Sequence, residues 1–170
     1  MNKERLLTLS LLVFAAAVAR IVPHPANVAP IAAIALFSGA QFERKWQAFS
    51  IPLAAMLLSD LVIGFYSQMW VTYLAFAAVV CIGFKLRGNP GFTKLLLGTL
   101  AGSVAFFLVT NFALWSHYEM YPHTLDGIMQ SYTMALPFFR NSLFGDLFYS
   151  GLLFGGFALA QRSFPALKAA

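Results

Sequence analysis

The sequence predicts an all-α integral membrane protein, a compact bundle of six transmembrane helices that forms a single domain over residues 1–170. Of the 170 residues, 60% are hydrophobic and only 10% are charged, and the mean hydropathy is +0.75. Soluble domains are about 45–50% apolar and about 25% charged. A chain this short cannot bury so much apolar surface in one core, so a soluble fold is excluded.

Apolar stretches of membrane-spanning length recur along the chain, and a spanning helix needs about 20 such residues. The N-terminal stretch also resembles a signal peptide, but the hydrophobic segments that follow it favour a first membrane helix. The second stretch is short and follows a proline-rich break, which indicates a half-helix. Helices are expected because backbone polar groups in lipid need internal partners. The predicted segments are 5–22, 30–41, 46–65, 69–87, 93–115 and 141–162.

The basic residues support six crossings. With this layout nine of them fall on one side of the membrane, and only Arg20 and Arg140 remain on the other. Cytoplasmic loops carry an excess of Lys and Arg, so we expect both termini in the cytoplasm. The formal charge of +5 is explained in this way and does not indicate a nucleic-acid partner. The nine residues are Lys3, Arg5, Arg44, Lys45, Lys85, Arg87, Lys94, Arg162 and Lys168.

Three connections then face outward: "VPHPANVAP", the turn around "YSQMW", and the long stretch 116–140. All three histidines, His24, His117 and His123, lie in the first and the last of them. In the long stretch Thr124 is a predicted helix cap, which favours a lid or an interfacial helix, with a solvated loop as the alternative. The apolar face of that helix would comprise Leu125, Ile128, Met129, Tyr132 and Leu136.

Cys81 is the single cysteine, which excludes an internal disulfide and a multi-cysteine metal cluster. If the fourth segment enters the membrane at Trp70, Cys81 lies about 16 Å deep, near the midplane where transporters bind small molecules. Leu74, Ala77 and Ala78 share its helical stripe with Trp70, and the two alanines leave space for a ligand. The alternative is that Cys81 is a small buried hydrophobe.

Asp60 is an acid within a membrane segment, where acids usually face the protein interior and find a partner. It lies at about the depth of Arg20, so one interpretation is an Arg20–Asp60 ion pair, and the other is that Asp60 binds ligand amides or hydroxyls. Asn111 is a weaker intramembrane polar residue that would bond a neighbouring helix.

Small residues at helical spacing suggest close helix contacts. Ala15 and Ala19 on the first segment would allow internal packing or docking of another subunit, and Gly151, Gly155 and Gly156 are interpreted as helix packing. The sequence contains no nucleophile–base–acid set, phosphate loop or HExxH pattern, so nothing in it supports a hydrolase or a nucleotide-using enzyme.

The architecture, together with the "PHPANVAPIAAIALFSGA" and "LLSDLVIG" blocks and the single mid-membrane cysteine, resembles the S-components of energy-coupling-factor (ECF) vitamin transporters. Within them it is most similar to the small, solitary BtuM group associated with vitamin B12. The overall likeness covers the whole chain, and the narrower one rests on about 40 residues between His24 and Cys81.

The resemblance implies a cobalamin-binding transport protein of the bacterial cytoplasmic (inner) membrane, with an outward pocket and 116–140 as its lid. It also implies Cys81 as the cobalt ligand, since a thiolate is a soft donor suited to a transition metal. Thiolate binding would displace an axial ligand such as cyanide. The residues expected to bind the rim of the corrinoid are His24, Asn27, Asp60, Tyr66, Tyr73, His117 and Tyr118.

Several alternatives stay open at this stage. His24 or His117 would compete with Cys81 as the axial ligand. An ECF energising module would dock on the Ala15/Ala19 face, or the protein would work alone by facilitated diffusion. The other functions to weigh are an S-component for a smaller vitamin or a metal ion, a small membrane enzyme, and a structural subunit.

Overall fold

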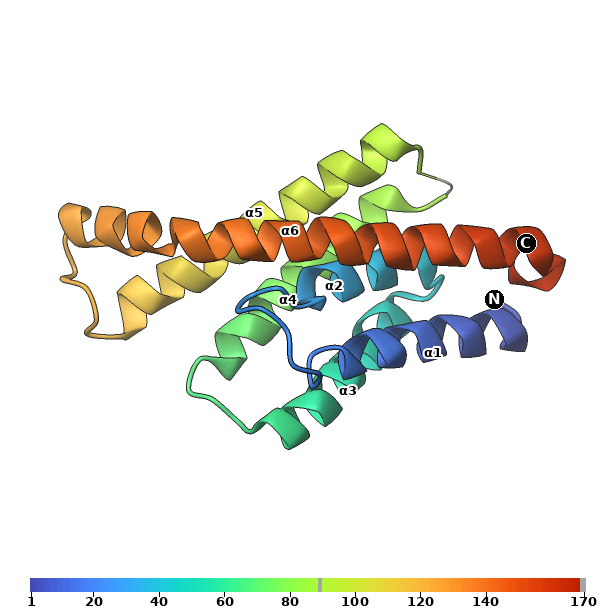
Figure 1. Cartoon of the computed structure of the whole chain (residues 1–170), viewed down its shortest axis with the longest axis horizontal. Helices are drawn as coiled ribbons and strands as arrows, with labels where there is room; N and C mark the ends of the chain where they lie inside the picture. Colours follow the sequence, from blue (N-terminus) through green and yellow to red (C-terminus); the bar gives the residue numbers. More distant parts are fainter. Residues whose placement is uncertain (89, 169–170) are drawn as a thin grey trace.

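The computed structural model describes residues 1–88 and 90–168, which form six α-helices and contain no strand (Figure 1). Four helical stretches, Lys45–Ile63, Met69–Leu86, Phe92–His117 and Leu125–Ser163, are long and apolar enough to cross a membrane. The prediction of an all-α chain with several such helices is therefore confirmed. The helices are α1 (Lys3–Val18), α2 (Ile31–Gln41), α3 (Lys45–Ile63), α4 (Met69–Gly83), α5 (Phe92–His117) and α6 (Leu125–Ser163), with short 3₁₀ turns η1 (Phe84–Leu86) and η2 (Pro165–Leu167).

The main difference from the expected layout is the length of α6. We predicted a lid over 116–140 and a separate helix over 141–162, but a single 39-residue helix begins at Leu125. Thr124 caps it as predicted, because its side chain accepts a hydrogen bond from the N–H of Gly127. The polar residues around Arg140 interrupt the apolar pattern without ending the helix. At 1.5 Å per residue α6 is about 58 Å long, so its first turns extend beyond a hydrocarbon core of about 30 Å.

The first helix is shorter than predicted. α1 has 16 residues and ends at Val18, where we expected the segment to continue to residue 22. Hydrogen-bonded turns follow, with the N–H of Arg20 donating to the carbonyl of Ala17. The helix is about 24 Å long, which is less than the thickness of a typical bilayer core.

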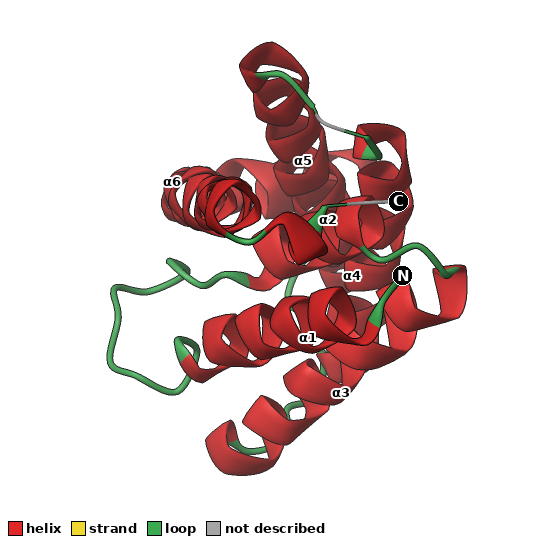
Figure 2. Cartoon of the chain, turned by 90° about the vertical axis from the view of Figure 1, so that its right-hand side faces the viewer, coloured by secondary structure: helices red, strands yellow, loops and turns green. Residues whose placement is uncertain are grey.

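The short helix α2 lies in the middle of the bundle, with α1, α4, α5 and α6 around it (Figure 2). Nine of its 11 residues are buried, and it packs against all five other helices. The predicted half-helix is therefore present, and it forms the central element of the core. Ile34, Leu36 and Phe37 on α2 are almost completely buried, and Phe37 packs edge-to-face on Phe154 and Phe157 of α6.

Glycines allow the close approach of α2 and α4. A Cβ on Gly39 of α2 would overlap the carbonyl oxygen of Val80, and one on Gly83 of α4 would overlap that of Leu36. Small residues at helix interfaces let backbones approach in membranes, where packing drives helix association. This crossing has no room for a side chain on either glycine.

The glycines of α6 behave differently. No heavy atom of another part of the chain lies within 4 Å of a Cβ built on Gly151, Gly155 or Gly156, and all three are exposed. Our interpretation of this pattern as helix packing is therefore wrong within the described part of the chain. The spacing places the three residues toward one side of the helix but does not determine which side faces the core.

The termini and the basic connections lie at one end of the bundle. The Met1 ammonium pairs with Glu43, Arg5 donates to Gln41, and Arg87 donates to the carbonyl of Phe42. Figure 1 shows the N- and C-termini at this end and the α5–α6 connection at the other. The described part of the bundle thus has a basic end that carries the termini and an opposite end that carries the α5–α6 connection.

The glycine contacts yield a matched stability test. Gly39→Ala forces α2 and α4 apart, and we expect it to lower the free energy of unfolding by about 1–3 kcal/mol, the usual cost of overpacking. Gly151→Ala adds the same methyl group in open space and should cause no loss. Thermal unfolding of both variants in detergent measures the difference, and equal stability of the two would contradict the tight crossing.

Candidate functional site

A cavity of about 480 Å³ lies between α5, the N-terminal half of α6 and the α1–α2 connection. We call it the outer cavity, because it is at the end opposite the termini. Its volume is in the range of about 300–1,000 Å³ that is typical of small-molecule sites. Aromatic and apolar side chains form most of the wall, among them Phe106, Phe107, Phe138, Phe139 and Met134, and the polar residues include Asn27, Ser103, Asn111, Ser131 and Asp146.

Asp146 joins the outer cavity to the start of α2. Its side chain is buried, and the hydroxyl of Ser103 on α5 donates to its Oδ2 at 2.7 Å. The backbone amides of Ala32 and Ala33, in the first turn of α2, also interact with the carboxylate. The first N–H groups of a helix have no partner within the helix, and the helix dipole favours a negative charge there. Asp146 therefore lies at the N-terminal end of the central helix.

Sequence reasoning missed Asp146 and Ser103. The signal was present, since Asp146 is an acid within an apolar stretch, "LFGDLF", by the same rule that identified Asp60. The link to α2 was not predictable, because 113 positions separate Ala33 from Asp146 and only the fold brings them together.

Hydrogen bonds hold the wall between α5 and α6. The hydroxyl of Ser131 donates to the carbonyl of Asn111 at 3.2 Å, and the hydroxyl of Tyr132 donates to the carbonyl of Leu108 at 2.8 Å. The Asn111 amide donates to the carbonyl of Phe107 on its own helix. We expected Asn111 to bond a neighbouring helix through its side chain, and in the structure its backbone makes that contact.

Asp60 and Arg20 form the predicted ion pair, with 2.6 Å between Arg20 Nη2 and Asp60 Oδ1. Tyr73 donates to the other carboxylate oxygen at 2.8 Å, and Arg20 also donates to Ser59. Asp60 is completely buried. The network joins the end of α1 to α3 and α4. Both carboxylate oxygens of Asp60 have partners within the protein, as the ion-pair interpretation requires.

Cys81 is exposed on the surface of the bundle. Trp70 and Leu74, from the predicted stripe, are 49% and 57% exposed, and Ala77 and Ala78 are partly exposed. These five residues form an open surface on one side of α4, which we call the α4 face. Cys81 therefore lies on the surface of the bundle and not in its core, and the thiol does not line the outer cavity.

Three of the predicted rim residues lie at the outer ends of α4 and α5. The His117 ring packs on Trp70 with 5.1 Å between ring centroids, and the Tyr118 hydroxyl donates to the carbonyl of Ser67 at 3.1 Å. Tyr66, next to Ser67, is exposed. Because Trp70 belongs to the α4 face, these polar groups border its outer edge.

The remaining two rim residues lie in the α1–α2 connection. His24 is exposed and its Nδ1 is 2.7 Å from the carbonyl oxygen of Val22, whereas Asn27 lines the outer cavity. Asn27 has a left-handed φ of 64°, which Asn tolerates better than most residues. Asn141 on α6 donates to the carbonyl of Ala26 and so anchors this loop.

The predicted site residues thus fall into three groups, and the structure does not bring them into one pocket. Asp60 and Tyr73 belong to the ion-pair network, His24 and Asn27 to the first connection, and the rest to the α4 face and its edge. Among the described residues, no three His, Cys, Asp or Glu side chains gather into a site for a bare metal ion.

A substitution of Asp60 tests whether this residue serves the ion pair with Arg20 or binds a ligand. Asp60→Asn keeps the shape but leaves the Arg20 charge buried without a counter-ion, which costs about 3–5 kcal/mol. We therefore expect a large loss of thermal stability in detergent without any ligand. Glu119→Gln, at an exposed acid in the α5–α6 connection, should leave stability unchanged. A wild-type melting temperature for Asp60→Asn would contradict the structural role.

Comparison with known proteins identifies the family of the chain. Residues 1–167 match the model of DUF6580, a family of unknown function. No curated protein and no solved structure matches the chain. The match covers nearly the whole sequence, and the chain therefore belongs to the DUF6580 family.

Proposed function

We propose that this protein is a multi-pass protein of the bacterial cytoplasmic membrane that binds cobalamin at its outer side and carries it inward. The proposal comes from the resemblance to the BtuM group of ECF-type S-components. The observation that supports it most is the exposure of the only thiol, Cys81, on an open surface of α4. This surface belongs to a stretch that is long and apolar enough to cross a membrane, so it faces either lipid or a bound ligand.

The α4 face suits a corrinoid better than the outer cavity does. A corrinoid is broad, flat and far larger than the molecules that a cavity of about 480 Å³ holds. Ala77 and Ala78, between Leu74 and Cys81, carry small side chains and are partly exposed. A thiolate is a soft, strong donor for cobalt, and metal binding would keep the thiol deprotonated.

The outer edge of this face offers groups for the amides of the corrinoid rim. Tyr66, His117 and Tyr118 each provide a donor or an acceptor there. His117 is also the chief competitor of Cys81 as an axial ligand, because its exposed imidazole lies against Trp70. His24 is the other histidine to test, although it lies in the α1–α2 connection.

A second function is favoured by the outer cavity itself. Its volume and its mixture of aromatic walls with Ser103, Asn111 and Asp146 are typical of a site for a small molecule. In that case the protein is an S-component for a smaller vitamin, and Cys81 is inert. The cavity has no feature that selects one compound.

Transport against a gradient requires an energy source, and the sequence has no ATP-binding motif. The side of α1 that faces away from the bundle is open. Leu7, Leu11 and Val18 are exposed there, beside Ala15 and Ala19. Small and apolar residues at such a surface suit helix docking in a membrane, so this side is where an ECF energising module would bind.

The proposed orientation predicts the labelling of cysteines introduced in a Cys81→Ala background. His123→Cys, in the α5–α6 connection, should react with a membrane-impermeant maleimide on spheroplasts, in which the cytoplasmic membrane is intact. Lys168→Cys, at the opposite end, should react only after that membrane is opened. The reverse pattern would show that the protein has the opposite orientation. Labelling of both introduced cysteines before lysis would contradict the membrane topology.

The proposed ligand predicts a change in the visible spectrum of cobalamin. Mixed with detergent-purified wild-type protein, cobalamin should show shifted absorption bands, because a thiolate replaces its upper axial ligand. Cys81→Ala should abolish the shift, whereas His117→Ala should retain it.

Two results would contradict this assignment. A shift that persists in Cys81→Ala and disappears in His117→Ala would move the axial ligand to the histidine. No binding of cobalamin by a folded wild-type protein would exclude cobalamin and leave the small-molecule function of the outer cavity.

A further inference from the structure

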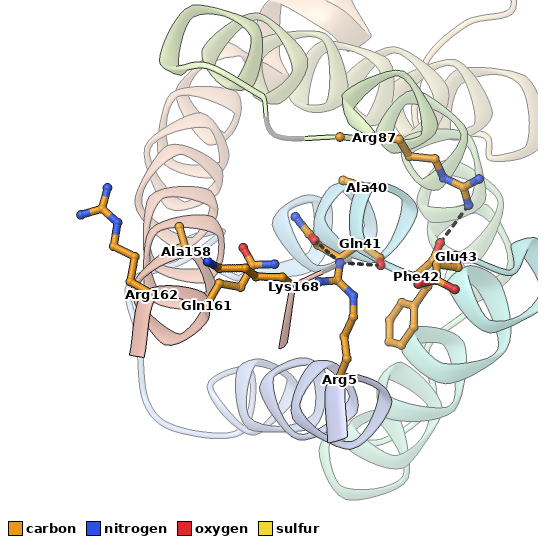
Figure 3. A pocket seen from close by; sticks show the side chains of 11 residues that line it. Arg5, Ala40, Gln41, Phe42, Glu43, Arg87, Ala158, Gln161, Arg162 and Lys168 are labelled. Carbon is orange, nitrogen blue, oxygen red and sulfur yellow. Dashed lines mark hydrogen bonds between the residues drawn. The ribbon is translucent and has the colours of Figure 1, made fainter. Parts of the chain in front are cut away.

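A second cavity, of about 600 Å³, lies at the end of the bundle that carries the termini (Figure 3). We call it the inner cavity. It is bordered by α1, the end of α2, the segment after η1, the last turns of α6 and the C-terminal segment. Four basic residues line it: Arg5, Arg87, Arg162 and Lys168.

Arg5 is the deepest of these cations, and it has an unused donor. Only 4% of its surface is exposed. Its guanidinium donates to the carbonyl of Leu167 and to Gln41 Oε1, the latter at 3.0 Å. Its Nε has no hydrogen-bond partner among the described residues. A buried donor without an acceptor is costly, so an anionic acceptor at this guanidinium would remove that cost.

The cavity has an excess of positive charge. Its one lining acid, Glu43, pairs with the Met1 ammonium. Arg87 donates to the carbonyls of Gly39 and Phe42 at the end of α2, which are dipoles and carry no net charge. Arg162 and Lys168 are exposed. Among the described residues that line the cavity, one carboxylate therefore accompanies four cations.

We propose that the inner cavity binds the phosphate of an acidic phospholipid headgroup. Guanidinium groups match phosphate geometry, and basic pockets between membrane helices on the cytoplasmic side suit anionic headgroups. Exposed aromatic side chains at the same end, Trp46, Phe92 and Phe164, lie where an interfacial belt would contact the bilayer. The inference depends on the sidedness of the bundle and is independent of cobalamin.

A bound phosphate would join parts of the chain that are distant in sequence. Arg5 comes from α1, Arg87 from the segment after η1, and Lys168 from the C-terminal segment. These parts enclose the end of α2. The lipid would therefore stabilise the inner end of the bundle by bridging them.

The test compares two double variants that remove the same charge. Arg162→Gln with Lys168→Gln removes two cations that line the cavity, whereas Lys45→Gln with Lys94→Gln removes two exposed ones at the same end that do not. Each protein is titrated with phosphatidylglycerol in a phosphatidylcholine background. Native mass spectrometry measures the bound lipid, and thermal unfolding measures stabilisation.

We expect wild type and the control pair to retain phosphatidylglycerol, and the cavity pair to bind it about tenfold more weakly. Arg5→Lys keeps the charge but removes Nε, so it should also weaken binding if it folds. If both double variants lost phosphatidylglycerol binding equally, the lipid would be attracted to the basic surface as a whole, and the proposal would be overturned. Equal retention of phosphatidylcholine, or full stabilisation by inorganic phosphate alone, would overturn the assignment to an acidic lipid.

Discussion

The burial of α2 is the constraint on which the rest of the structure depends. A helix whose two ends lie inside a bundle leaves its first N–H groups and its last carbonyls without water, so other side chains must satisfy them. At the N-terminal end Asp146 interacts with the free amides, and Ser103 holds the carboxylate. At the C-terminal end Arg5 and Arg87 donate to the carbonyls. An acidic side chain at the start and basic side chains at the end also match the helix dipole.

The shortness of the same helix explains both cavities. Eleven residues span about 17 Å, which is roughly half of a hydrocarbon core of about 30 Å. The longer helices around α2 therefore enclose space beyond each of its ends. The outer cavity adjoins its first turn through Asp146, and the inner cavity adjoins its last residues, Ala40 and Gln41. One cavity has an apolar, aromatic wall and the other is basic, so the two ends of α2 face different chemistry.

The sequence predicted the features that follow from local rules. The prolines before Pro30 indicated the half-helix, Thr124 indicated a helix start, and one acid and one base at equal depth indicated the Arg20–Asp60 pair. The features that depend on tertiary contacts were not predictable. A helical wheel places Cys81 on a stripe but does not say that the stripe lies on the surface, and no local signal joins Asp146 to α2.

The central functional claim is that the protein carries cobalamin across the cytoplasmic membrane. The most direct test is the accumulation of radiolabelled cobalamin by bacteria that lack their own inner-membrane cobalamin transporter and express this chain. Accumulation well above that of cells with an empty vector, and its loss on expression of Cys81→Ala at equal abundance, is the predicted result. No accumulation by cells that insert the folded wild-type protein in the membrane would contradict the claim.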